Sequence, residues 1–303
     1  RQNIFFNRIY NKEIWTTDEI LMKHKFTNAY RASDRVSQYL IKEVIYNHSQ
    51  ETKEVLFRIL LFKTFNKIET WEALLRCLGS ITYADFNFKE YDYILTTIIN
   101  SKRTIYSGAY IMTSGKSRFG YSKKHRNHLK LIEYMMEDRL EDKISGLKNM
   151  SCLFRLLKSY PTIGNFLAYQ YATDINYSEI CDFNEMDFVC PGPGALDGIK
   201  KCFTDLGEYD ESDIIRYVTE RQEQEFSRLN LNFKNLWGRN LQLIDCQNLF
   251  CEVDKYARIA HPEINGISGR TRIKQKFKPK NGKIDYWYPP KWKINENIKD
   301  YEK

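Results

Sequence analysis

The stretch from Asp187 to Phe203 constrains the fold of this chain more than any other. Its first half places two prolines and two glycines at positions 191–194, and an amphipathic segment follows immediately. Proline removes a backbone N–H and glycine favours irregular conformations, so neither a continuous helix nor a central strand can pass through these residues. The stretch therefore predicts a turn that leads into the N-terminus of a helix.

Two interpretations suit the predicted turn. A helix N-terminus exposes free backbone N–H groups at the positive end of the helix dipole, and glycine allows a ligand to approach the backbone closely. Lys200 and Lys201 follow one to two helical turns later. The turn thus either holds a phosphate group or simply joins two helices.

The composition is that of a folded protein. The chain has 303 residues, of which 42% are hydrophobic and 15% aromatic, enough for one large domain or two closely packed ones. No apolar run approaches the roughly 18 residues of a membrane span, and no signal peptide is visible. We therefore expect a soluble, cytoplasmic protein.

The cysteine spacing argues against a metal centre. The seven cysteines form no Cys-x-x-Cys pair and are not accompanied by a histidine pair at the spacing of zinc ligands. We expect them to be reduced thiols, mostly buried. Nothing in the sequence requires a metal ion or another cofactor.

Positive charge is concentrated near the C-terminus. The formal net charge is +8, and positions 270–293 hold nine Lys or Arg residues against one acid, Asp285. Clustered positive charge is expected of a protein with a nucleic-acid partner, although a solvated tail is a common alternative. We accordingly divide the chain into a helical domain, 1–269, and a basic, irregular C-terminal extension, 270–303.

Apolar residues recur at helical spacing through most of the remaining chain, which predicts an all-α fold. Segment 55–65 is apolar nearly all round and should be a central, buried helix. The other helices that the pattern predicts lie within 11–46, 69–78, 88–99, 129–140, 150–158, 163–171, 212–229 and 241–259.

Arg31, Asp34 and Arg35 stand three and four positions apart, which places them on one helix face. They form either an exposed cluster of ion pairs or a site in which an arginine faces a substrate phosphate.

A second basic region, 101–128, mixes lysines and arginines with aromatic residues and glycines, and includes Lys116 and Arg118. It suits either a surface that neutralises phosphates and stacks on bases, or a solvated loop. Gly115-Lys116-Ser117 does not make a nucleotide-binding P-loop, because Tyr110 occupies the position of the required earlier glycine.

Polar residues recur on the otherwise apolar helix predicted at 241–259. They stand three, four and seven positions apart and so share one face: Asp245, Asn248, Glu252 and Lys255 or Tyr256. A polar stripe on an apolar helix is costly unless it is solvated, paired or lining a site. The stripe therefore predicts either a functional site or a structural network of ion pairs.

Five blocks of the sequence, in order, resemble one protein family. They lie within about residues 11–261 and read Lys25-Phe-Thr-Asn-Ala-Tyr-Arg-Ala-Ser-Asp-Arg35, Phe62-Lys-Thr-Phe-Asn66, Phe166-Leu-Ala-Tyr-Gln-Tyr-Ala-Thr-Asp174, Asp187-Phe-Val-Cys-Pro-Gly-Pro-Gly194 and Cys251-Glu-Val-Asp-Lys-Tyr256. The family is that of the alpha-glutamyl/putrescinyl thymine pyrophosphorylases, whose domain is also called the helical domain of 5-hydroxymethyl-deoxyuridine DNA kinases. The resemblance implies an all-helical domain similar to helix-hairpin-helix DNA glycosylases and associated with hypermodified bases in phage DNA.

The resemblance also implies roles for individual residues. Residues 187–203 would contain the hairpin that holds the DNA backbone. Together with the basic residues above, the implied DNA-contacting set is Gly192, Gly194, Gly198, Lys200, Lys201, Arg31, Arg35, Lys116 and Arg118. The acid that such glycosylases carry on a later helix corresponds best to Asp245, with Glu252 second, although Asp245 lies about fifty residues beyond the hairpin. No kinase motif accompanies the domain.

We therefore predict a DNA glycosylase that excises a modified pyrimidine and leaves an abasic site, in a conflict between phage and host. Its substrate would be a glycosylated or otherwise hypermodified 5-hydroxymethylcytosine or 5-hydroxymethyluracil. The target nucleotide has to leave the duplex, and Tyr30, Tyr169 and Tyr256 are candidates for the pocket that receives the base.

A carboxylate has to stabilise the oxocarbenium-like transition state while a water is activated, and Asp245 is the predicted group. Glu252 or Asp174 would orient the base or the water, although capping a helix is the commoner role for a residue placed like Asp174. Lys255 is a less favoured amine nucleophile, since it could instead pair with Glu252. Two alternatives stay open: a transferase that installs a group on 5-hydroxymethyluracil in DNA, and a non-catalytic DNA-binding module.

Overall fold

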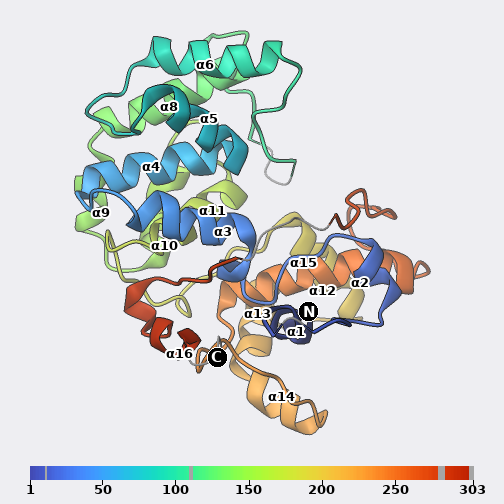
Figure 1. Ribbon diagram of the computed structural model, residues 1–303. Coiled ribbons are helices and arrows are strands. Elements are labelled where there is room, and N and C mark those ends of the chain that lie inside the picture. The colour runs from blue at the N-terminus through green and yellow to red at the C-terminus, as the bar shows by residue number, and fades with distance from the viewer. Residues whose placement is uncertain (11, 109–111, 279–283, 300–303) are drawn as a thin grey trace. The chain divides into compact units, whose positions relative to one another are not determined.

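The computed structural model describes residues 1–10, 12–108, 112–278 and 284–299 (Figure 1). Tyr110 and two parts of the predicted extension, 279–283 and 300–303, lie outside these ranges. Helices and connecting loops make up the described residues, and no β-strand occurs among them. The prediction of an all-α fold is confirmed. None of the described helices is long and apolar enough to cross a membrane.

The chain folds as two compact units. The discontinuous unit combines Arg1–Arg35 with Phe188–Lys303, and the inserted unit is Val36–Asp187. Helix α11 (Asn165–Ile175), which precedes the predicted hairpin stretch 187–203, and α12 (Pro193–Cys202), which lies within it, therefore belong to different units. The likeness to a helix-hairpin-helix and the domain boundary at residue 270 stay predictions.

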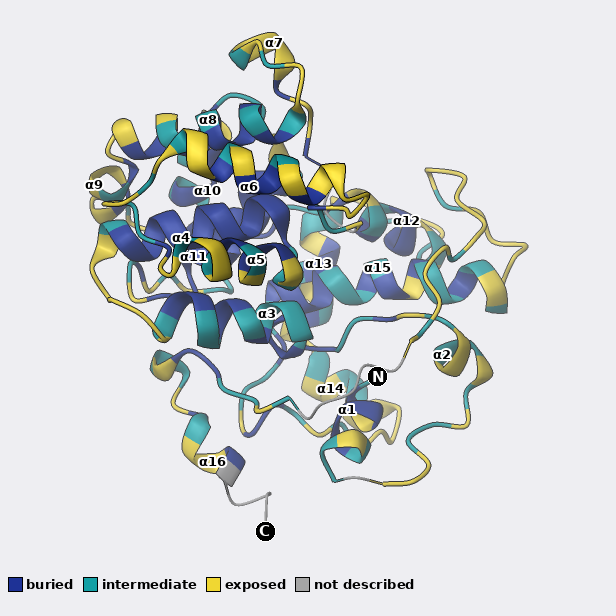
Figure 2. Cartoon of the chain, turned by 45° about the horizontal axis from the view of Figure 1, so that its top comes forward, coloured by how far each residue is buried: buried dark blue, intermediate teal, exposed yellow. Residues whose placement is uncertain are grey.

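The inserted unit is built around α4 (Thr52–Phe65), which is buried almost throughout, as its apolar sequence predicts (Figure 2). Arg58 of this helix donates Nε to Val44 O at 2.8 Å and Nη2 to Ser49 O at 2.6 Å. One buried guanidinium thus satisfies carbonyl groups near the end of the preceding π-helix and in the loop after it. The other helices are α3 (Arg35–Tyr39), the π-helix η2 (Leu40–Tyr46), α5 (Ile68–Leu78), α6 (Phe88–Asn100), α7 (Lys116–Phe119), α8 (Lys124–Glu137), α9 (Leu140–Ser145) and α10 (Met150–Lys158).

The discontinuous unit centres on α12 and α15 (Leu243–Ala260), which pack against each other (Figure 1). The helix predicted at 212–229 is interrupted at Arg221 and forms two helices instead. The other helices of this unit are α1 (Gln2–Ile9), α2 (Glu19–Lys23), η1 (Arg31–Ser33), α13 (Glu211–Glu220), α14 (Gln222–Arg228), η3 (Pro290–Trp292) and α16 (Asn295–Lys299).

Two glycines let α12 approach α15 closely. A Cβ added at Gly198 would lie 2.0 Å from Phe250 O, and one added at Gly194 would lie 3.0 Å from Cys251 Sγ. The two glycines stand four residues apart and therefore share one face of the helix. The absence of a side chain at these two positions allows the two helices to pack closely.

Asp197, also on α12, holds the loop that follows α15. Its Oδ1 accepts a hydrogen bond from Ser268 N at 2.7 Å, and its Oδ2 lies 2.8 Å from Arg270 Nη2. Burial alone would raise the pKa of Asp197, but these hydrogen bonds and the arginine charge bring the pKa below its ordinary value. Arg270, the first residue of the predicted extension, is thus bonded to α12, although its side chain is 46% exposed.

Other described residues of the C-terminal extension carry buried side chains. Tyr288 is fully buried, and its hydroxyl shares a hydrogen bond of 2.8 Å with Ser33 Oγ. Asn295 Nδ2 donates to Tyr288 O and Asn295 Oδ1 accepts from Tyr288 N, both at 2.8 Å. Deleting 270–303 would remove core side chains together with positive charge, so single charge substitutions test the role of this segment more cleanly.

Candidate functional site

Helix α15 presents its polar stripe to the backbone of residues 25–31. Asp245 is only 5% exposed, and its Oδ1 accepts a hydrogen bond from Arg31 N at 2.8 Å. Its Oδ2 accepts one from Gln242 N at 3.0 Å, which is part of a capping box at the start of α15. Both carboxylate oxygens of the predicted catalytic acid are thus bonded to backbone N–H groups.

Glu252 and Lys255 hold the same backbone segment further along α15. Glu252 Oε2 accepts from Thr27 N at 3.0 Å and lies 2.8 Å from Lys255 Nζ. Lys255 Nζ also donates to Lys25 O at 3.1 Å. The side chains of three residues predicted to be catalytic, Asp245, Glu252 and Lys255, therefore all bind the backbone of residues 25–31. Their contacts are those of the structural network that the sequence left open as an alternative.

Arg1, Asn28 and Asp34 complete the cluster around residues 25–31, and no pattern in the sequence singles out the first two. Arg1 donates Nε to Thr27 O at 2.8 Å and Nη2 to Asn28 Oδ1 at 3.0 Å. Asn28 donates its backbone N–H to Asp34 Oδ1 at 2.8 Å and Nδ2 to Ser33 O at 2.7 Å. Asparagine often bonds nearby backbone in this way, which is the one signal that could have identified Asn28.

Asp34 should make the protein lose stability between about pH 4 and pH 7. Burial raises the pKa of this carboxyl from 3.8 to about 7, against the hydrogen bond from Asn28 N, and the Glu252 charge adds to the rise. Between the two values the folded protein holds a proton on Asp34 that the unfolded chain releases, so the contribution of Asp34 to stability is greatest below about pH 4 and declines up to about pH 7. Urea denaturation across this range should show the decline in wild type relative to Asp34→Asn. Parallel curves would contradict the prediction.

The two arginines next to this cluster are not on an open helix face. Arg31 is 3% exposed, and Arg35, at the start of α3, is half-buried. Direct contact between Arg31 and a DNA phosphate would therefore require the surrounding segment to open.

The three tyrosines predicted to line one base pocket take different positions. Tyr30 is 1% exposed; its hydroxyl donates to Arg239 O at 2.7 Å and accepts from Leu236 N at 3.2 Å. The hydroxyl of Tyr256 donates at 2.7 Å to the aspartate that caps α2. Tyr169 is buried within the inserted unit. Tyr30 thus supports the turn at 236–239 and does not offer an open ring face.

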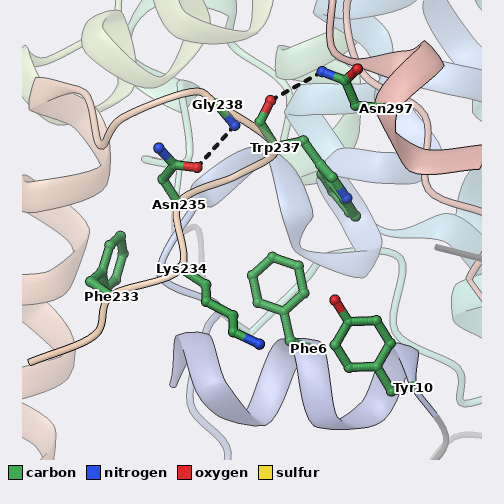
Figure 3. A pocket seen from close by; sticks show the side chains of 8 residues that line it. All are labelled: Phe6, Tyr10, Phe233, Lys234, Asn235, Trp237, Gly238 and Asn297. Carbon is green, nitrogen blue, oxygen red and sulfur yellow. Dashed lines mark hydrogen bonds between the residues drawn. The ribbon is translucent and has the colours of Figure 1, made fainter. Parts of the chain in front are cut away.

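A pocket of about 550 Å³ lies beside this turn, in the discontinuous unit (Figure 3). Helix α1 and the loop before α15 supply most of its walls, and α16 contributes one residue. The lining residues are Phe6, Tyr10, Phe233, Lys234, Asn235, Trp237, Gly238 and Asn297. They form no recognised motif; the aromatic residues around an Asn-Leu-Trp-Gly turn are the only hint that the sequence offers.

The residues of the predicted hairpin divide between packing and solvent. Gly192 is the N-cap of α12, whereas the two packing glycines face α15. Lys201 Nζ lies 3.1 Å from Asp254 Oδ1, and the two side chains are 4% and 1% exposed. Lys200 is left at the surface of α12.

The inserted unit holds the remaining predicted residues. Asp174 Oδ2 lies 2.9 Å from Lys63 Nζ, in a pair whose side chains are 1% and 2% exposed. Lys116 and Arg118 are exposed on α7 (Figure 2). Within the described ranges, no group of three or more His, Cys, Asp or Glu residues is placed to hold a metal ion.

Asp245→Asn should destabilise the protein by about 1–3 kcal/mol, because an amide offers one acceptor oxygen to two buried N–H groups. Asp213 occupies the equivalent position in the capping box of α13 but is exposed. Asp213→Asn is therefore the matched control, with an expected change within about 0.5 kcal/mol. Urea denaturation gives both values, and equal effects of the two substitutions would contradict the structural role of Asp245.

Comparison with known proteins places these features in a family. Residues 1–266 match the family described as "5-hmdU DNA kinase, helical domain". A curated relative, the 5-hmdU DNA kinase of Bacillus phage SP10, is 28% identical over 277 residues, which cover 84% of this chain and 43% of the relative. The chain thus spans less than half the length of that relative. No solved structure matches the chain.

These matches correct the predicted chemistry. A kinase transfers a phosphoryl group, whereas a glycosylase hydrolyses the bond between base and sugar, so the prediction of a DNA glycosylase is wrong. The transferase alternative agrees better with the matches. The buried, doubly bonded carboxylate of Asp245 also suits a structural group better than an acid facing a substrate. The family suggested by the five sequence blocks is confirmed: the chain belongs to the family of 5-hmdU DNA kinase helical domains.

Proposed function

We propose that this chain recognises DNA containing 5-hydroxymethyl-deoxyuridine and serves the transfer of a group to the 5-hydroxymethyl oxygen. The observation that carries the proposal is the family match over residues 1–266, together with a relative named as a 5-hmdU DNA kinase. Because the chain corresponds to less than half of that relative, substrate recognition is the part of the reaction that we assign to it.

The contacts around α15 support a role in positioning. Phosphoryl transfer depends largely on orienting the reactants and stabilising charge, and a base inside a duplex has to leave the stack before an enzyme can reach it. Asp245 and Glu252 fix the backbone of residues 25–31 through hydrogen bonds to its N–H groups. They therefore provide a rigid frame for a substrate site, and the reacting groups need not be these acids.

A direct test compares two otherwise identical duplexes, one carrying 5-hydroxymethyl-deoxyuridine and the other thymidine. We expect tighter binding to the modified duplex, with both affinities falling as salt rises. Incubation with ATP and mass spectrometry of the digested nucleosides then shows whether this chain by itself adds a phosphoryl group. Equal affinity for the two duplexes, or abasic sites in the modified one, would overturn the proposal.

Exposed lysine and arginine side chains should contribute to DNA binding whatever the base sequence of the DNA. Lys200→Ala, and separately Lys116→Ala with Arg118→Ala, should weaken binding to both duplexes. Each lost phosphate contact lowers the slope of log affinity against log salt by about 0.9. Lys89→Ala, at another exposed lysine, on α6, provides the control. Slopes equal to that of wild type would show that these residues do not contact phosphates.

A further inference from the structure

The walls of the pocket in Figure 3 are aromatic rings from two distant parts of the chain. Phe6 lies on α1 and Tyr10 is the C-cap of that helix, and their rings stack with centres 6.0 Å apart. Trp237 meets Phe6 edge-on at 5.6 Å. Phe233 stacks on Phe226 at 4.3 Å, which holds its ring in place. A volume of about 550 Å³ lies within the range of small-molecule sites in proteins.

The turn that carries Trp237 is held in an unusual conformation. Trp237 and Gly238 have φ angles of 50° and 97°, a region that residues with a Cβ rarely adopt. Asn235 Oδ1 accepts from Gly238 N at 2.9 Å, and Asn297 Nδ2 donates to Trp237 O at 3.3 Å (Figure 3). Tyr30, from the first of the five family blocks, bonds the same turn from within the protein. Such a strained, well-supported turn is typical of a binding site.

Lys234 gives the pocket a positive charge. Its side chain is exposed, and Nζ lies 5.8 Å from the centre of the Tyr10 ring. The residues that line the pocket include no Asp or Glu. An aromatic wall beside a lysine suits a ligand that has both a planar ring and an anionic group. A nucleotide has both, because its base stacks on aromatic side chains and its phosphate attracts lysine.

We propose that this pocket binds one nucleotide, with the base against Phe233 and the phosphate near Lys234. The inference deepens the proposed function and rests on it, because group transfer to a base in DNA brings two nucleotides to the enzyme. One is the nucleotide of the DNA that leaves the stack, and the other is a free nucleoside triphosphate that donates the group. Both present the same chemistry to the pocket, and separate titrations distinguish them.

The test measures the affinity of the purified chain for two probes in separate titrations. The first is a short single-stranded oligodeoxynucleotide with one 5-hydroxymethyl-deoxyuridine, and the second is ATP. Phe233→Ala should weaken binding of the nucleotide that occupies the pocket by about tenfold or more. Lys234→Ala should weaken the same binding chiefly at low salt. Quenching of tryptophan fluorescence by the probe should be reduced in Trp237→Phe.

Matched variants exclude indirect effects. Phe233→Leu keeps an apolar side chain beside Phe226, so the fold should be retained. It removes the aromatic ring, so stacking on the base is lost. Lys89→Ala removes an exposed charge from the inserted unit and should leave both affinities unchanged. Urea denaturation shows that each variant is folded before its affinity is interpreted.

A loss confined to the oligonucleotide identifies the bound nucleotide as part of DNA, and a loss confined to ATP identifies it as the donor. Wild-type affinity for both probes in folded Phe233→Leu and Lys234→Ala would overturn the pocket assignment. That failure would leave the proposed function intact, because the preference of the wild-type chain for the modified duplex is measured independently.

Discussion

Gly198→Ala should destroy the stable packing of the discontinuous unit. The added Cβ would stand 2.0 Å from Phe250 O, and a backbone atom cannot move aside unless α12 and α15 separate. Overpacking usually costs about 1–3 kcal/mol and more where the backbone has to shift, whereas whole domains are stable by only about 5–15 kcal/mol. We expect a loss of at least about 3 kcal/mol, seen as a much lower urea midpoint or as insoluble protein.

Two other glycines make this prediction specific. At Gly194 the nearest atom to an added Cβ is a side-chain sulfur at 3.0 Å, which can rotate, so Gly194→Ala should have an intermediate effect. Gly146 has a φ of −88° and nothing within 4 Å of an added Cβ. Gly146→Ala should therefore change stability by no more than about 0.5 kcal/mol or raise it slightly. An unfolding midpoint for Gly198→Ala close to that of Gly146→Ala would show that the two helices are not held at this distance.

Asp254→Ala should have the second largest effect, a loss of about 3–5 kcal/mol. The carboxylate pairs with Lys201 at 3.1 Å and with Arg258, and the side chains of these two cations are 4% and 9% exposed. Removing the acid leaves two buried positive charges without their partner, which is the costly way to break a buried ion pair. Urea denaturation provides the measurement.

A double substitution and a surface control separate charge from packing. Adding Lys201→Met to Asp254→Ala should recover part of the lost stability, because it removes one of the unpaired charges. Glu208→Ala, at an exposed acid in the loop after α12, should change the free energy of unfolding by no more than about 0.5 kcal/mol. If the double variant is less stable than Asp254→Ala, the unpaired charge of Lys201 is not what destabilises the single variant.

Local sequence patterns predicted the positions of the helices better than they predicted the residues that the helices contact. The all-round apolar sequence of α4 and the polar stripe of α15 are both present where the spacing placed them. The partner of the stripe is the backbone at Thr27 and Arg31, more than 200 residues away in the sequence. No periodicity within a helix contains that information, so a carboxylate that binds backbone N–H groups looks the same in sequence as one that faces a substrate.

The glycines of α12 show the same ambiguity, and the neighbouring lysines show how part of it could have been resolved. A missing Cβ allows close approach of a phosphate or of another helix, and the residue type does not distinguish the two. Lys201, however, stands three residues after Gly198 and seven after Gly194, on the face where the glycines lie. Lys200 is rotated away by about 100°. Spacing alone therefore contained the reason why Lys201 is buried and Lys200 is exposed.

The division of the chain into a discontinuous and an inserted unit has a consequence for biosynthesis. All residues of the inserted unit, 36–187, are synthesised before those of α12 and α15. The segment 25–31 meanwhile lacks Glu252 and Asp245, the acids that hold its backbone. Contacts over such sequence separations form slowly, because a long loop has to close before they are made. The polar network around residues 25–31 is therefore assembled late in translation, when the inserted unit can already be compact.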